Sequence, residues 1–257
     1  MTTVTAGLRS IKGRIRRLLD VPREPRLERL TIPIDRCRHY NGYKYGSSSF
    51  NPYENYIVGM HQGVDRGVLR ERFEDFLRYF RPRDLGELLQ VPLSRTVPMW
   101  VYPWDARAPI RPHGGWLETA ASVEDIITHF SEQGVQRSKI QGEYFWLERA
   151  LATIATEGYR PERFSYIDVL ELRDGAESVY IVKDGNHRLS SLVAFGHTHV
   201  AVSRDAAETV DLSRCARWPH VASGLYSTED ARALVRAYFR GVTDFRRADV
   251  PAAFLDE

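Results

Sequence analysis

The sequence predicts an α/β fold of the α+β kind, in which a small mixed sheet is packed against helices. Two extended segments, 164–172 and 178–182, are joined by an Arg-Asp-Gly turn of the kind that closes a β-hairpin. The second segment leads through a glycine-containing turn into a helical pattern at 187–195, and a further extended segment follows at 199–203. Strands interrupted by one short helix indicate a mixed sheet with helical cover.

Helices are also expected on both sides of this segment. Apolar residues recur every three or four positions in several stretches, which is typical of helices with one buried face. Ser227 and Gly241 stand where an N-cap and a C-terminal stop would limit the last of these helices. The expected elements are helices at 64–80, 85–89, 122–130, 142–156 and 228–240, with a strand at 97–102.

The length and composition suit one large globular domain or one domain with a substantial extension. Of the 257 residues, 43% are hydrophobic and 27% are charged, which is enough apolar surface for a buried core. The stretch 39–62, rich in tyrosine, asparagine and glycine, is expected to be a long loop. Four parts follow: a basic amphipathic helix and linker, a mostly helical and loop-rich N-terminal extension, a core, and a C-terminal helical extension, at 1–30, 31–137, 138–203 and 204–257.

The expected compartment is the cytoplasm. No run approaches the ~20 consecutive apolar residues that cross a bilayer, and the first residues lack the apolar segment of a secretory signal. The two cysteines, Cys37 and Cys215, are far apart and have no metal-like spacing. Two isolated cysteines in a chain of this length favour a reducing environment.

Positive charge is concentrated at the N-terminus. Residues 1–30 carry eight Lys or Arg against three acidic residues, a net +5, so the rest of the chain carries −3 of the total of +2. Apolar residues at helical spacing between arginines predict a basic amphipathic helix at 7–19. This helix would cover the core, dock peripherally on an anionic membrane, or contact a protein partner. Nucleic-acid binding is disfavoured because the body has no basic excess.

The most informative motif is Asp184-Gly185-Asn186-His187-Arg188, where a strand passes into a helix. A helix that opens after a glycine turn presents free backbone N–H groups and the positive end of its dipole to an anion. Arg188 suits bidentate phosphate binding, and His187 can donate a hydrogen bond or a proton. Asp184 could hold a divalent ion or position a hydroxyl group. The plain alternative is a capped helix with an exposed arginine.

The residues around this motif resemble a known signature. Residues 180–189 followed by 194–200 are similar to the ParB/sulfiredoxin superfamily, in which a strand enters Asp-Gly-x-His-Arg, a short helix ends at glycine, and a strand follows at once. The helix that ends at Gly158 and the strand after Pro161 resemble the preceding helix–strand unit. The resemblance covers about residues 138–203 and implies a small mixed sheet with helices.

Departures from the pattern separate the members of this superfamily. Sulfiredoxin has a reactive cysteine just before His-Arg, where this chain has Asn186, and neither cysteine lies at the motif. Sulfinic-acid reduction is therefore disfavoured. ParB carries Gly-Glu-Arg-Arg here and needs a DNA-reading helical domain downstream. Only residues 204–257 follow the expected core, which argues against a partition protein.

The free serine kinases of the superfamily carry Asp-Gly-His-His-Arg, which differs from this motif only at Asn186. The resemblance implies a phosphotransferase that uses ATP, ADP or CTP with Mg²⁺ and acts on a small hydroxyl-bearing metabolite. His187 and Arg188 would contact the phosphates with Gly185 and Asn186, and Asp184 would lie near the metal and the attacking hydroxyl. Glu143 is the nearest positional candidate for the upstream glutamate that these kinases use as a general base. The alternative is a nucleotide-switched binding module that senses CTP or ATP.

Other side chains are weaker candidates. Ser190 and Ser191 follow on the same helix and would face phosphate or neighbouring residues. His197 and His199 would share one face of a strand, but no third metal ligand has suitable spacing. Four aromatic residues bracket a glycine turn at 112–116 and could line a sugar or nucleobase pocket; they are Trp100, Tyr102, Trp104 and Trp116.

Overall fold

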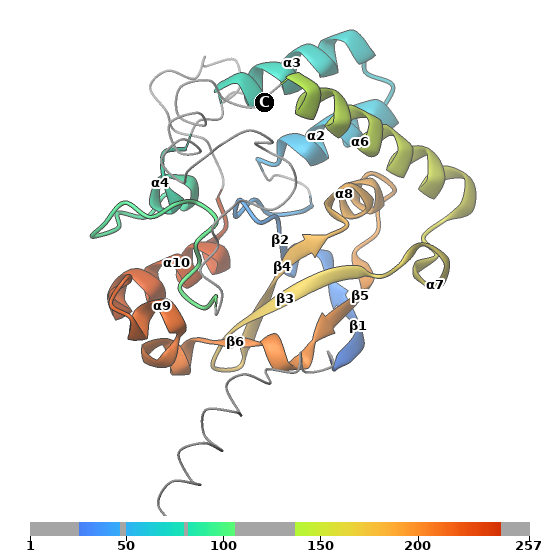
Figure 1. Ribbon diagram of the computed structural model, residues 1–257. Helices are drawn as coiled ribbons and strands as arrows, with labels where there is room; N and C mark the ends of the chain where they lie inside the picture. Colours follow the sequence, from blue (N-terminus) through green and yellow to red (C-terminus); the bar gives the residue numbers. More distant parts are fainter. Residues whose placement is uncertain (1–25, 47–49, 80–81, 106–136, 243–257) are drawn as a thin grey trace, which may run out of the picture.

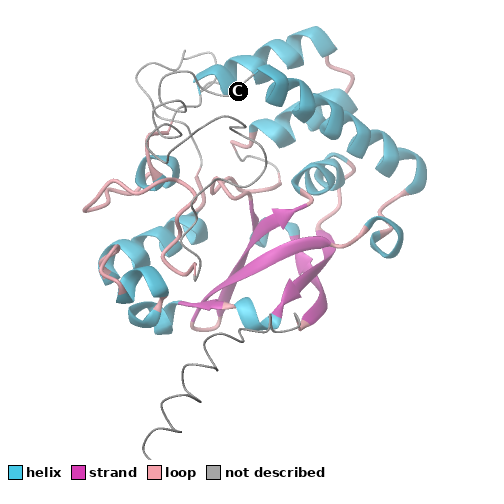
Figure 2. Cartoon of the chain, viewed as in Figure 1, coloured by secondary structure: helices cyan, strands magenta, loops and turns pink. Residues whose placement is uncertain are grey.

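The computed structural model describes residues 26–46, 50–79, 82–105 and 137–242. Three expected features lie outside these residues: the basic helix at 7–19, the helix at 122–130 and the glycine turn at 112–116. Within the described part of the chain, no helix is long and apolar enough to cross a membrane. The described residues form a mixed α/β fold around one sheet (Figures 1 and 2).

The sheet of the described residues has six strands, in the order β1-β5-β3-β4-β2, with β6 paired to β3. The central hairpin β3–β4 and the outer pair β1–β5 are antiparallel, whereas β3–β5, β2–β4 and β3–β6 are parallel. The strands are β1 Leu27–Pro33, β2 Cys37–Arg38, β3 Ile167–Asp174, β4 Glu177–Asp184, β5 His199–Asp205 and β6 Val210–Asp211.

The sheet includes a part of the chain that was expected to lie outside it. β1 and β2 come from residues 27–38, far upstream of 138–203, so the N-terminal extension is not only helices and loops. β1 alternates between exposed and buried positions and places Ile32 opposite Val200 of β5. Such alternation is typical of an edge strand with one buried face.

Helices lie on both sides of the sheet. Figure 1 shows α8 next to the sheet, with α6, α2 and α3 beyond it, while α10 and α9 lie at the opposite side. The helices are α2 Pro52–His61, α3 Arg66–Tyr79, α4 Leu85–Leu89, α6 Arg137–Glu157, α7 Pro161–Phe164, α8 Asn186–Ala194, α9 Pro219–Ala222 and α10 Thr228–Arg240, with 3₁₀ turns at Ile34–Arg36, Ala206–Glu208 and Leu212–Arg217.

α8 is fixed by its apolar face. Leu189 and Leu192 are fully buried and pack with Val169, Val182 and Val202 of the three central strands. Full burial of a leucine or valine side chain contributes about 1.5–3 kcal/mol, so this face holds α8 firmly on the sheet. The residues at the start of α8 are thereby placed at the end of β4.

Most of the expected elements are confirmed, with adjusted ends. The helices expected at 64–80, 85–89, 142–156 and 228–240 correspond to α3, α4, α6 and α10. Ser227 accepts a hydrogen bond from the backbone N–H of Asp230 at 2.9 Å, as an N-cap does, and the helix ends at Gly241. The strand expected from residue 164 begins only at Ile167, because Phe164 still belongs to α7.

Two expectations are wrong. Residues 97–102 do not form a strand, because a turn occupies residues 99–100, although Val97 and Val101 are buried. The segment 39–62 is not one long loop, because α2 occupies its second half. Asn51 caps α2 by accepting the backbone N–H of Glu54 at 3.3 Å, and Pro52 takes the first helical position, where its missing N–H has no cost.

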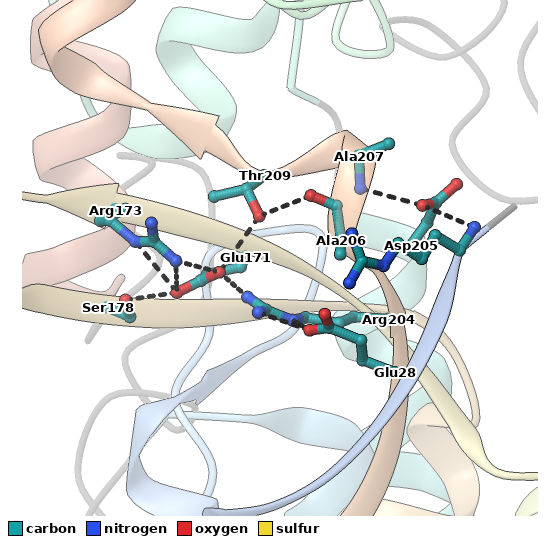
Figure 3. Close-up of polar contacts among 10 residues, drawn as sticks. Glu28, Glu171, Arg173, Ser178, Arg204, Asp205, Ala206, Ala207 and Thr209 are labelled. Atoms are coloured by element: carbon teal, nitrogen blue, oxygen red, sulfur yellow. Dashed lines mark hydrogen bonds and ion pairs between the residues drawn. The ribbon is translucent and has the colours of Figure 1, made fainter.

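A buried carboxylate ties three strands together (Figure 3). Glu171 of β3 is 4% exposed, and it accepts hydrogen bonds from Arg173 at 2.9 Å, Ser178 at 2.7 Å and Thr209 at 3.2 Å. Glu171 also pairs with Arg204 of β5, which reaches Glu28 of β1 at 2.8 Å. Because its donors are in place, this buried charge is compensated and links β1, β5 and β3.

Candidate functional site

The expected phosphate motif lies at the junction of β4 and α8. Gly185 separates the two elements with a φ of 96°, and a Cβ atom there would lie 2.8 Å from Cγ1 of Ile167 and 2.9 Å from Nη2 of Arg188. Glycine is therefore required both by the backbone and by the space. α8 begins at Asn186 without a side-chain cap, so its first turn presents backbone N–H groups and a positive dipole end.

The structure brings His187 together with Glu143 of α6. Nε2 of His187 lies 2.8 Å from Oε2 of Glu143, and their side chains are 29% and 9% exposed. Leu147, in the next turn of α6, is fully buried and holds this stretch of the helix against the core. Ser191 adds a hydrogen bond from its hydroxyl to the carbonyl of His187 at 2.9 Å. The result is a half-buried imidazole–carboxylate pair at the N-terminus of α8.

A second histidine lies close to this pair, and the sequence did not single it out. His39 is 1% exposed, and its ring centroid lies 3.9 Å from that of Tyr40 and 4.9 Å from that of Tyr53. Burial lowers the pKa of His39 to about 3, with the charge of Glu143 opposing the fall and that of His187 adding to it. Because Nδ1 accepts the backbone N–H of Asn41 at 3.2 Å, the neutral ring carries its proton on Nε2.

Asn186 is held by the segment that precedes α2. The buried hydroxyl of Tyr45 donates to Oδ1 of Asn186 at 2.6 Å. The next residue, Gly46, donates its backbone N–H to the two carboxylate oxygens of Glu54 at 3.1 and 3.0 Å. Burial raises the pKa of Glu54 to about 7, and the bond from Gly46 opposes the rise. A second buried carboxyl group is thus connected to the motif through Tyr45.

Arg188 and Asp184 are arranged differently from the expected phosphate contacts. Nη2 of Arg188 donates to Oδ2 of Asp184 at 3.0 Å, and Nη1 donates to the carbonyls of Phe164 at 3.0 Å and Ser165 at 2.5 Å. These carbonyls lie at the C-terminal end of α7, which favours a cation. Arg188 would have to leave them to bind phosphate in a bidentate manner.

The other expected ligands differ in exposure. The side chain of Asp184 is 73% exposed, whereas Ser190 is fully buried and its hydroxyl has no hydrogen-bond partner among the described residues. The described residues contain no group of three or more His, Cys, Asp or Glu that could hold a metal, which leaves His197 and His199 without a third ligand. A single exposed carboxylate fits Mg²⁺ held mainly by phosphates and water, and not a metal held by protein alone.

The aromatic residues expected to line a pocket belong to the core near α10. The rings of Tyr102 and Trp104 are stacked at 5.2 Å, and Trp104 also contacts Trp218 and Tyr238. Trp100 packs at the edge of the same cluster. Trp116 lies outside the residues that the structure describes. The prediction of a pocket built from these rings therefore has no support.

A groove of about 900 Å³ lies elsewhere, around α4. Its lining includes three arginines, but Arg83 pairs with Glu87 at 3.2 Å and Arg95 donates to the carbonyl of Gly224 at 3.2 Å. The groove contains no residue of the motif. Arg83 and Arg95 thus serve local structure, and the candidate site remains at the start of α8.

The chain was compared with protein families, curated proteins and solved structures. No protein-family model, no curated protein and no solved structure matches this chain.

Proposed function

We propose that the protein binds the polyphosphate of a nucleotide at the N-terminus of α8 and transfers a phosphoryl group to a small hydroxyl compound. One observation carries the proposal: the first turn of α8 has no side-chain cap and contains His187, whose ring lies 2.8 Å from Glu143. An uncapped helix start attracts anions, and a carboxylate beside it supplies a proton acceptor. The resemblance of 184–188 to the motif of the free serine kinases supports the same chemistry.

Each residue has a defined part in this reaction. The backbone N–H groups of the first turn and His187 would hold the phosphate oxygens, while Glu143 would accept the proton of the substrate hydroxyl. The hydroxyl oxygen forms a bond to the terminal phosphorus as the bond from that phosphorus to the bridging oxygen breaks, and the shortened nucleotide leaves with those electrons. Mg²⁺, with Asp184 as its one protein ligand, would neutralise phosphate charge.

A second candidate function is a nucleotide-switched binding module. The observation that favours it is the attachment of Arg188 to the carbonyls of Phe164 and Ser165. A phosphate that attracted Arg188 would break its hydrogen bonds to these carbonyls. The position of α7 would then depend on whether a nucleotide is bound. Such a change could then be passed to a membrane or protein partner through residues 7–19. DNA binding is less favoured because the chain outside 1–30 carries −3.

The direct test is phosphoryl transfer from labelled ATP, ADP or CTP with Mg²⁺ to a pool of hydroxyl metabolites. We expect a labelled product with the wild-type protein and its loss in His187→Ala. His199→Ala is the matched control, because His199 is exposed on β5 and its side-chain hydrogen bond among the described residues is with the adjacent Thr198. Asp184→Ala separates the two functions: a kinase loses turnover, whereas a switched module keeps its partner. Absence of transfer by the wild type would refute the kinase.

A further inference from the structure

Two large aromatic side chains stand exposed on α6. Phe145 is 56% exposed and Trp146 is 51% exposed, and their rings meet edge to face with centroids 5.1 Å apart. The guanidinium carbon of Arg149 lies 5.4 Å from the indole centroid and 5.9 Å from that of Phe145. Two adjacent exposed aromatic side chains beside a cation offer an apolar face on which a flat ring can pack.

Trp146 lies on the side of α6 that carries Glu143. Residues three apart on a helix are neighbours, with Cβ atoms ~5–6 Å apart, whereas residues two apart point away from each other. Trp146 is three residues after Glu143, and Phe145 is two residues after it. The Cβ atom of Trp146 is therefore a neighbour of the Cβ atom of Glu143 on the helix surface, whereas the Cβ atom of Phe145 points away from it.

Gly142, four residues before Trp146 on α6, leaves the helix surface without a side chain at that position. Helical side chains lean toward the N-terminus, so Trp146 leans back over the turn that contains Gly142. A Cβ atom at Gly142 would have no other atom within 4 Å. Among the described residues, no side chain fills the space at Gly142, so a flat ring has room there to approach the indole.

We propose that Trp146 stacks on the base of the nucleotide whose phosphates bind the N-terminus of α8. The inference rests on the proposed function and specifies how the nucleoside is held. Every nucleobase has a π-face, so stacking alone accepts purines and pyrimidines. The guanidinium group of Arg149 also attracts the indole ring and helps to hold it in place. Trp146 would accordingly set the affinity for the nucleoside without touching the transferred phosphate.

The test compares ligands with and without a base. Binding of ATP, CTP and inorganic tripolyphosphate, each with Mg²⁺, is measured by calorimetry for the wild type, Trp146→Leu and Phe145→Leu. Both substitutions keep an exposed apolar residue with good helix propensity, so the melting temperature should be unchanged. We expect Trp146→Leu to weaken ATP and CTP about tenfold, which is 1.4 kcal/mol, and to leave tripolyphosphate unchanged. Phe145→Leu should change each affinity less than twofold. Quenching of tryptophan emission by ATP should be lost in Trp146→Leu.

The outcomes separate this inference from the proposed function. If Trp146→Leu binds nucleotides as tightly as the wild type, or if tripolyphosphate binds the wild type as tightly as ATP, the stacking role is overturned while the phosphate site stands. Equal losses in both variants would also overturn it, because they would indicate a general effect of the exposed patch. If the wild type binds neither nucleotides nor tripolyphosphate, both proposals fall.

Discussion

Oε2 of Glu143 lies 2.8 Å from Nε2 of His187, although the two residues are 44 positions apart in the sequence. The contact joins the longest helix of the described residues to the first turn of α8. It places a nearly buried carboxylate within hydrogen-bond reach of the residue that would bind phosphate. In the proposed function, this imidazole and carboxylate at an uncapped helix start would form a proton-transfer unit next to the bound phosphate.

Glu143→Gln should lower phosphoryl transfer at least about 100-fold, because a positioned general base contributes ~10²–10⁴-fold. The amide keeps the shape and a hydrogen bond to His187 but does not accept a proton. The KM for the nucleotide should change much less than kcat. Steady-state kinetics with Glu148→Gln as a control test this, since Glu148 is on the same helix but pairs with Arg70 of α3. An unchanged kcat would contradict the assigned role of Glu143.

Gly185→Ala should destabilise the protein and impair the site together. The new methyl group would lie 2.8 Å from Ile167 and 2.9 Å from Arg188, at a φ of 96° that alanine rarely adopts. Strain of this kind costs about 1–3 kcal/mol, to which the clash adds. Gly175→Ala is the matched control. Gly175 also has a positive φ, but a Cβ atom there would meet no atom of the described residues within 4 Å. Denaturant titration should show the larger loss at Gly185, and equal losses would contradict this account.

Glu54 should make stability depend on pH. Burial raises its pKa in the folded protein to about 7 from an ordinary value of 4.5, so folding favours the neutral carboxyl group. Its stabilising contribution is complete below about pH 4.5 and is lost as the pH rises through about 7, a change on the order of 3 kcal/mol. Glu54→Gln keeps an acceptor for the N–H of Gly46, and its stability should depend less on pH between pH 5 and 9. If the melting temperatures of the wild type and of Glu54→Gln change equally with pH over this range, Glu54 is not the cause of the pH dependence.

Glu171→Leu should cost about 3 kcal/mol of unfolding free energy, because it leaves Arg204 and Arg173 without their buried partner. Glu28→Gln is the control. Glu28 bonds the same Arg204, but its side chain is 34% exposed, so its loss should cost less than about 1 kcal/mol. Chemical denaturation measures both values. Comparable costs for the two variants would show that the buried network contributes no more than a surface pair.

The sequence predicted the part of the fold in which local signals agree. The hairpin β3–β4, the start of α8 and the capped α10 each combine turn chemistry with a matching apolar period, and all three are present. β1 and α2 were missed because their signals conflict. Pro25 and Pro33 enclose β1 and made it resemble a linker, and the proline and glycine of α2 made it resemble a loop, although Pro52 suits a first helical position.

The candidate site was predictable only where it is contiguous. Residues 184–188 form one stretch with a recognisable order of strand, turn and helix. Glu143 was proposed by position, and its contact with His187 depends on how α6 packs across α8. His39 and Tyr45 come from the segment between β2 and α2, which β2 places beside β4, and no spacing rule links them to the motif. Their only sequence signal was the dense run of tyrosine and histidine after residue 38.

The most direct test of the central claim is a calorimetric titration of the wild-type protein and His187→Ala with ATP, ADP and CTP in the presence of Mg²⁺. The account predicts saturable one-to-one binding of at least one of these nucleotides. It also predicts that His187→Ala weakens this binding at least about tenfold, or 1.4 kcal/mol, because one donor to the phosphate is lost. Failure of all three nucleotides to bind the wild type, or unchanged binding by His187→Ala, would contradict a phosphate site at the start of α8.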